Sequence, residues 1–127
     1  MDVFIYGTLT DPERADRVLD TYEYRGRARL DGLHRVEGEY PTLAPGGSVA
    51  GRVLRTPDVA ALDRYEGVDR ELYVRVSVPR ADRDGSVAVY VGDPGALGAD
   101  ATWPGTGSFA DQVERYVADR AVTVAGT

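Results

Sequence analysis

The hydrophobic pattern divides the chain into short strands and a few amphipathic helices. Val3, Phe4 and Ile5 are consecutive and apolar, so a buried strand is predicted over residues 2–6, ending at Gly7. Alternating or continuous apolar residues predict further strands over residues 24–39 (two strands or one bulged strand), 49–54, 72–79 and 87–92. Between the last two, Asp84-Gly85 is typical of a hairpin turn.

Helices are predicted where apolar residues recur every three or four positions behind a capping residue. The pattern predicts a first helix to about residue 20 that Thr10 or Asp11 caps, a second from residues 56–58 to Gly67, and a third after Ser108. Residues 40–47, which include two prolines, and residues 95–107 are predicted to be irregular, and residues 122–127 to form a short tail.

Strands that precede and interleave with only three helices indicate an α+β domain, in which helices flank a curved, mixed sheet or small β-barrel. A length of 127 residues suits one core, so residues 1–127 are expected to form a single domain.

The composition narrows the possible chemistry. The chain has no cysteine, which excludes thiol catalysis, disulfides and cysteine-ligated metals, and its single histidine, His34, argues against a histidine metal cluster. A general base must therefore be Asp, Glu or Tyr. No Gly-x-Gly-x-x-Gly or P-loop pattern supports nucleotide binding.

The charge balance argues against a nucleic-acid partner. Twenty-one acidic residues oppose fifteen basic ones for a formal charge of −6, and every basic residue is arginine. The acidic excess and the lack of lysine fit a halophilic protein adapted to concentrated salt, while high genomic GC content would also replace lysine by arginine. No apolar run approaches the ~20 residues of a membrane span and no secretory signal is visible, so a cytoplasmic location is expected.

Glu66 is the strongest candidate for acid-base chemistry. It lies at the end of the second predicted helix, and Tyr73 and Arg75 follow on one face of the next strand. Burial among apolar neighbours would raise the pKa of Glu66, as a base that later donates a proton requires. The turn after the first strand could present backbone N–H groups to an anion or a developing oxyanion. A glutamate in this position is also often only a surface carboxylate.

Four segments together carry a family resemblance. They are residues 3–9 (Val-Phe-Ile-Tyr-Gly-Thr-Leu), residues 40–43 with 49–53, Leu62-Asp63-x-x-Glu66-Gly67 with Tyr73-x-Arg75, and residues 87–91. In their order and spacing the chain resembles the γ-glutamylcyclotransferase-like, or AIG2-like, superfamily over roughly its first three quarters. The resemblance implies a small mixed β-barrel flanked by helices, which agrees with the α+β prediction.

The resemblance also implies a reaction and roles for residues. Members cyclise a γ-glutamyl amide: the α-amine attacks the side-chain amide carbonyl, giving 5-oxoproline and a free amine, without a cofactor or metal. Glu66 would be the acid/base group. The loop of Tyr6, Gly7, Thr8 and Leu9 would hold the carboxylate end of the γ-glutamyl group, and the pocket-lining tyrosines of the family map onto Tyr73 and Tyr90.

Other assignments remain open from the sequence. Arg75 could bind a substrate carboxylate or form a surface ion pair, and Tyr40 on the proline-containing loop is a candidate for shaping the pocket. The expected partner is a small-molecule γ-glutamyl substrate, with no membrane partner, but neither the released amine nor the oligomeric state can be read. A non-catalytic module that binds a small metabolite is the main alternative, and a purely structural domain is the third.

Overall fold

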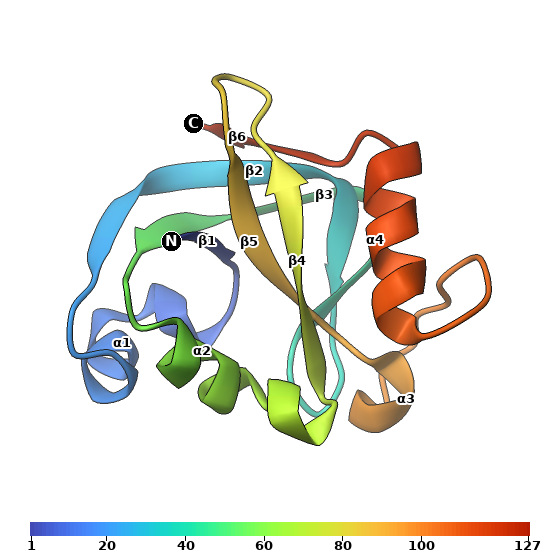
Figure 1. Ribbon diagram of the computed structural model, residues 1–127, viewed down its shortest axis with the longest axis horizontal. Helices are drawn as coiled ribbons and strands as arrows, with labels where there is room; N and C mark the ends of the chain where they lie inside the picture. The colour runs from blue at the N-terminus through green and yellow to red at the C-terminus, as the bar shows by residue number, and fades with distance from the viewer.

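A single curled, mixed β-sheet forms the body of the protein, and helices cover it (Figure 1). The computed structural model describes residues 1–127. The strand order is β4-β5-β1-β3-β2-β6, in which β1 and β5 are parallel and all other neighbours are antiparallel. The strands are β1 (Asp2–Ile5), β2 (Glu23–Val36), β3 (Thr42–Arg55), β4 (Tyr73–Pro79), β5 (Ser86–Gly92) and β6 (Thr123–Gly126).

The two edges of this sheet approach each other at one end. Arg80 forms an isolated parallel bridge with Val124 of β6, and the amide of Ala81 donates to the carbonyl oxygen of Val124 at 2.9 Å. The sheet therefore curls into a partly closed barrel, which confirms the prediction of an α+β fold with a small mixed barrel.

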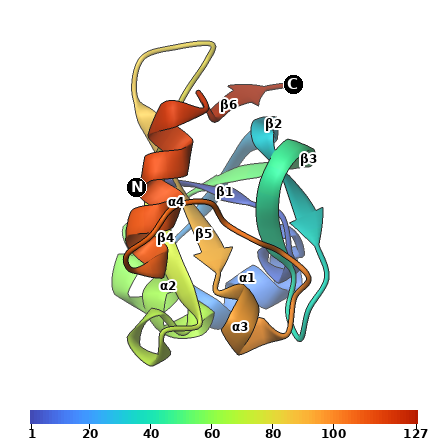
Figure 2. The same ribbon diagram turned by 90° about the vertical axis from the view of Figure 1, so that its right-hand side faces the viewer.

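Helices α1, α2 and α3 lie at one end of the curled sheet, and α4 packs beside it against β4 (Figures 1 and 2). The helices are α1 (Pro12–Val18), α2 (Val59–Glu66), α3 (Pro94–Leu97) and α4 (Phe109–Asp119), with 3-10 turns η1 (Thr8–Thr10) and η2 (Val68–Arg70). Asp11 caps α1 and Ser108 caps α4 through their side chains, and Gly67 ends α2 in the left-handed conformation. These three caps confirm sequence predictions.

The short strand β1 divides the core because its side chains alternate across the sheet. Phe4 joins the cluster inside the curl, which α4 closes with Val113 and Val117. Val3 and Ile5 point to the opposite face and join a second cluster that α2 covers. β1 therefore ends between the sheet and α2, and the loop that follows β1 lies there.

Several sequence predictions of local structure were wrong. Residues 42–47, predicted as loop, belong to β3. Proline is tolerated there because β1 pairs only with residues 52–55 of β3, so β3 has a free edge at Pro45. The predicted tail contains β6, whose four residues pair with β2 and are too few to show a clear alternation. A fourth helix, the four-residue α3, lies at the start of the predicted irregular region. Residues 24–39 contain one strand, β2, with two register shifts, as one of the two alternatives predicted.

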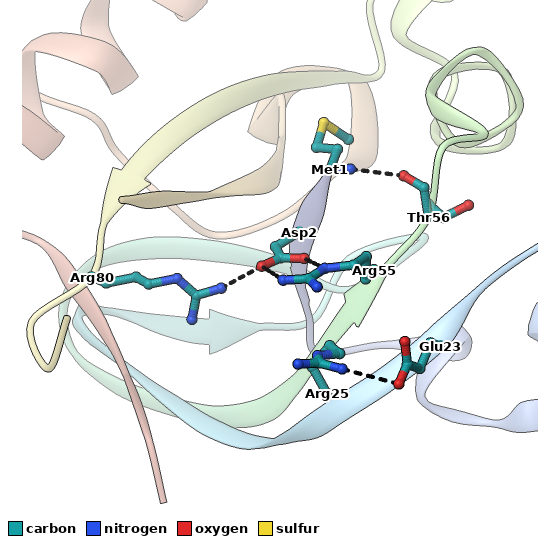
Figure 3. Close-up of polar contacts among 7 residues, drawn as sticks. All are labelled: Met1, Asp2, Glu23, Arg25, Arg55, Thr56 and Arg80. Carbon is teal, nitrogen blue, oxygen red and sulfur yellow. Dashed lines mark hydrogen bonds and ion pairs between the residues drawn. The ribbon is translucent and has the colours of Figure 1, made fainter. Parts of the chain in front are cut away.

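An ion-pair network fastens the beginning of β1 to its neighbours (Figure 3). Asp2 binds Arg55 of β3 at 2.7 Å and Arg80 beyond β4 at 2.6 Å. The hydrogen bond from Arg55 and the charges of both guanidinium groups hold the pKa of Asp2 below its usual range, against the opposing effect of burial. The Asp2 and Arg80 side chains are only 13% and 11% exposed, so solvent screens their interaction weakly.

We expect Asp2→Asn to lower the free energy of unfolding by about 2 kcal/mol at neutral pH, because it leaves Arg80 charged and poorly hydrated. Urea unfolding measures the effect. Glu23→Gln is the matched control, since it breaks the exposed Arg25–Glu23 pair seen in the same view (Figure 3) and should change stability little. Equal effects of the two substitutions would contradict a special contribution from Asp2.

Candidate functional site

A pocket of about 270 Å³ opens where β1 ends, between the sheet and α2. Its wall combines the loop after β1, the end of α2, the residues before β3, and the facing strands β4 and β5. The lining residues are Phe4, Ile5, Tyr6, Gly7, Thr8, Leu9, Arg14, Tyr40, Pro41, Tyr65, Glu66, Arg70, Leu72, Tyr73 and Tyr90.

The loop after β1 is held from outside, which leaves its inner side available. Thr10 donates to the carbonyl oxygen of Gly7 through both its hydroxyl (2.6 Å) and its amide (3.1 Å), and the Tyr24 hydroxyl donates to the Leu9 carbonyl oxygen at 2.7 Å. The amide of Gly7 has no acceptor within the protein. A Cβ atom on Gly7 would meet nothing within 4 Å, and its φ of −128° lies outside the left-handed region. Neither crowding nor a left-handed φ requires glycine here, and the lack of a side chain keeps the pocket wall open.

Glu66 is the last residue of α2 and is placed at the pocket because Gly67 ends the helix there. Its carboxylate is half-buried and makes no hydrogen bond or ion pair with any other residue. Burial raises its pKa to about 7, which confirms the direction expected from sequence. A carboxylate with this pKa can both accept and return a proton near neutral pH.

Three tyrosines, from the loop after β1 and from strands β4 and β5, line the pocket with Glu66, yet each donates its hydroxyl proton elsewhere. Tyr6 of the β1 loop donates to the carbonyl oxygen of Tyr90 at 2.6 Å, Tyr73 of β4 to that of Pro41 at 2.5 Å, and Tyr90 of β5 to a carboxylate oxygen of Asp63 at 2.7 Å. Burial is the main cause that raises the pKa of all three phenols, and the nearby charge of Glu66 adds to it. The phenols therefore stay protonated, and none of them donates to Glu66.

Positive charge reaches the pocket from two arginines. Arg14 of α1 donates to the Tyr65 hydroxyl at 3.3 Å, which in turn lies 2.6 Å from the Thr8 hydroxyl. Arg70 of η2 is exposed and lines the same pocket. Neither guanidinium forms an ion pair with a carboxylate, so both are available to an anionic group of a ligand.

No three His, Asp or Glu side chains gather closely enough to hold a metal ion. No helix is both long and apolar enough to cross a membrane.

Comparison with known families decides the relationship of the chain. Residues 3–107 match the family described as gamma-glutamyl cyclotransferase, AIG2-like. The chain belongs to this family. No curated protein matches it.

Solved structures share the fold of this AIG2-like chain. A structure described as gamma-glutamyl cyclotransferase is 20% identical, with a TM-score of 0.60 over 73% of this chain and 66% of that one. The solution structure of At5g39720.1 from Arabidopsis thaliana is 28% identical, with a TM-score of 0.57 over 94% and 84% of the two chains. The uncharacterized protein PH0828 from Pyrococcus horikoshii is 15% identical, with a TM-score of 0.59 over 91% and 96%. The chain spans just under two thirds of the length of the gamma-glutamyl cyclotransferase.

The structure brings almost all of the predicted site residues of this AIG2-like protein together. The predicted residues that line the pocket are Glu66, Tyr6, Gly7, Thr8, Leu9, Tyr40, Tyr73 and Tyr90. Arg75 does not line it: its Nε lies 3.7 Å from Asp63, and the same guanidinium contacts the sulfur of Met1 at 3.6 Å. Of the two uses considered for Arg75, the ion pair is the one that is formed.

Sequence reasoning missed several residues of the pocket. Arg14 and Tyr65 belong to segments that were interpreted only as helices, and Arg70 lies between the second predicted helix and the next predicted strand, where no structure was predicted. The spacing of Tyr65 and Arg70 around Glu66 gave a local signal, because residues flanking the end of a helix lie near its last side chain. Arg14 gave none, since α1 meets α2 only through the tertiary fold.

Proposed function

We propose that this protein cyclises a γ-glutamyl amide to 5-oxoproline and a free amine, with Glu66 as the acid/base group. The observation that carries the proposal is the half-buried carboxylate of Glu66 in the pocket. It has no hydrogen-bond or ion-pair partner among the other residues, and its pKa is raised to about 7. Membership in the gamma-glutamyl cyclotransferase, AIG2-like family agrees with this chemistry.

The reaction needs proton transfers that one carboxylate can relay. Ionised Glu66 takes a proton from the α-ammonium of the substrate, and the neutral amine attacks the side-chain amide carbonyl to form a new C–N bond. Protonated Glu66 gives this proton to the leaving nitrogen and takes the second proton from the attacking nitrogen as the old C–N bond breaks. Glu66 then passes the second proton to the released amine and returns to the carboxylate form.

The pocket can hold the substrate in the folded shape that this attack requires. The free amide of Gly7 and the Thr8 hydroxyl are candidates to bind the carboxylate of the γ-glutamyl group. Bringing the amine close to the carbonyl supplies roughly 7–11 kcal/mol in favourable intramolecular cases. Tyr6, Tyr73 and Tyr90 form part of the pocket wall, so on that side a bound substrate contacts protein instead of water.

Arg70 is expected to bind an anionic group of the substrate, because it carries an unpaired charge at the pocket. Arg70→Gln should raise KM roughly tenfold with little change in kcat, the effect of losing one charge-assisted hydrogen bond. Steady-state kinetics measures it. Arg64→Gln, which removes an exposed arginine of α2 outside the pocket, is the control. An unchanged KM in Arg70→Gln would remove Arg70 from the binding site.

The decisive experiment measures 5-oxoproline release by the purified protein over a panel of γ-glutamyl compounds that differ only in the amine. Calorimetry on the same panel measures binding. Release from at least one compound supports the proposal. Binding without release would favour the alternative, a non-catalytic module that binds a small metabolite, and neither binding nor release would favour a structural domain.

A further inference from the structure

The hydroxyl of Tyr90 donates to one carboxylate of α2 and shares the pocket with a second, Glu66. Asp63 and Glu66 are three residues apart in this helix, so their side chains lie side by side, with Cβ atoms about 5–6 Å apart. The Tyr90 hydroxyl donates to Asp63 at 2.7 Å, and Tyr90 also lines the pocket with Glu66. The Tyr90 hydroxyl proton is thus held by the carboxylate that lies one helical turn before Glu66.

Tyr90 differs from the other phenols near Glu66 in the kind of group that accepts its hydroxyl proton. Tyr6 and Tyr73 donate to backbone carbonyl oxygens, whose positions are fixed by the strands and loops that carry them. Tyr90 donates to a side chain. Asp63 is therefore the acceptor in this set that a side-chain substitution can remove without changing the backbone.

Asp63 is itself held in place by Arg75. The guanidinium Nε of Arg75 lies 3.7 Å from the same Asp63 oxygen that accepts the Tyr90 proton, and both side chains are about one third exposed. Arg75, Asp63 and Tyr90 thus connect β4, α2 and β5 next to the pocket.

We propose that Asp63 is a positioning residue, which holds the Tyr90 hydroxyl proton away from Glu66 and so leaves the Glu66 carboxylate free to take a proton from substrate. A carboxylate that accepts a hydrogen bond in its charged form becomes a weaker base. If the Tyr90 hydroxyl turned to Glu66, the carboxylate would gain such a bond and its pKa would fall from about 7 toward the ordinary value. The consequence for catalysis rests on the proposed function, whereas the effect on Glu66 does not.

Other groups around Glu66 act on it in every variant and must be kept constant. Apart from Asp63 and Tyr90, which the test changes, the titratable and charged residues that face the pocket are Tyr6 of the β1 loop, Arg14 of α1, Tyr40 before β3, Tyr65 of α2, Arg70 of η2 and Tyr73 of β4.

The test follows the titration of the Glu66 side-chain carboxyl carbon by NMR in protein labelled at glutamate, with Glu66→Gln used to assign the signal. In Asp63→Ala the Glu66 midpoint should fall by at least about one pH unit, the value of one hydrogen bond to a charged group. In Asp63→Ala/Tyr90→Phe the midpoint should return to within a few tenths of the wild-type value, because the phenol proton is gone.

Two further variants separate the phenol proton from the charge of Asp63. Asp63→Asn removes the charge but keeps an oxygen that can accept from Tyr90, so the Glu66 midpoint should move much less than in Asp63→Ala. A fall that persists in the double variant, or that is equally large in Asp63→Asn, overturns the proposal in favour of a pure charge effect.

Tyr90→Phe alone provides a test that does not depend on whether Asp63→Ala folds. It should leave the Glu66 midpoint unchanged, because the hydroxyl donates to Asp63 in the native protein. A rise in the midpoint would mean that Tyr90 already donates to Glu66, and would overturn the proposal.

Kinetics gives the functional consequence separately. The low-pH limb of kcat/KM for 5-oxoproline release should move to lower pH in Asp63→Ala by the same amount as the NMR midpoint. If no γ-glutamyl compound is turned over by the wild type, the proposed function fails, while the NMR titration still decides the role of Asp63.

Discussion

Glu66→Gln is expected to lower the rate of 5-oxoproline release by at least about a hundredfold, the usual share of a positioned acid/base group. Glutamine keeps the shape of the side chain but can neither accept the proton of the α-ammonium nor return it. The fold should be kept, because the carboxylate makes no hydrogen bond or ion pair within the protein. Substrate affinity should change little, because the glutamine side-chain oxygen can still accept a hydrogen bond from the α-ammonium. Single-turnover assays with calorimetry on the same substrate separate the two quantities.

Glu114→Gln is the control for this substitution, since it removes an exposed glutamate of α4 that lies outside the pocket. It should keep the wild-type rate. Wild-type release by folded Glu66→Gln would refute the acid/base assignment, and it would leave the family and the fold as they stand.

Local features of the fold could be predicted from sequence because each depends on neighbouring residues. Val3 to Ile5 form a strand that ends before Gly7, Ser108 caps a helix, and Asp84-Gly85 lies in the connection between two antiparallel strands. The strand at residues 42–47 could not be predicted in the same way. Pro45 argues against a strand unless the edge of β3 at Pro45 is known to have no partner. Whether that edge is free depends on how far β1 extends along β3.

The residues of the candidate site divide in the same way, into those that a short sequence motif indicates and those that only the tertiary fold brings to the pocket. Glu66 and the β1 loop are recognisable because each lies in a short motif, and the resemblance of those motifs to a family connected them. Arg75 was interpreted from its place beside Tyr73 on β4, which says nothing about the Asp63 partner that the fold supplies. Arg14 reaches the pocket only because α1 packs against α2, and no pattern within α1 encodes that contact.

The raised pKa of Glu66 has a consequence for stability that can be measured without any substrate. A carboxyl whose folded pKa is about 7 and whose ordinary value is 4.5 binds its proton more tightly in the folded protein. Below about pH 4.5 both states hold the proton and folding carries no penalty. Between about pH 4.5 and 7 the unfolded state releases the proton while the folded state still holds it, so stability falls across this range. Above pH 7 the folded state buries a charge that the unfolded state exposes to water. The difference of roughly 2.5 in pKa corresponds to about 3 kcal/mol.

We therefore expect Glu66→Gln to be more stable than the wild type at pH 8 by up to about 3 kcal/mol, and nearly equal to it at pH 4.5, because glutamine resembles the protonated carboxyl at every pH. Urea unfolding at a series of pH values measures this gap, and Glu114→Gln, which changes an exposed residue, should show no comparable dependence. A gap of the same size at both pH values would indicate that the substitution acts through packing. A gap that opens between pH 4.5 and 7 would show that the pocket maintains a carboxylate at a cost in stability, which is the expected signature of a group kept for proton transfer.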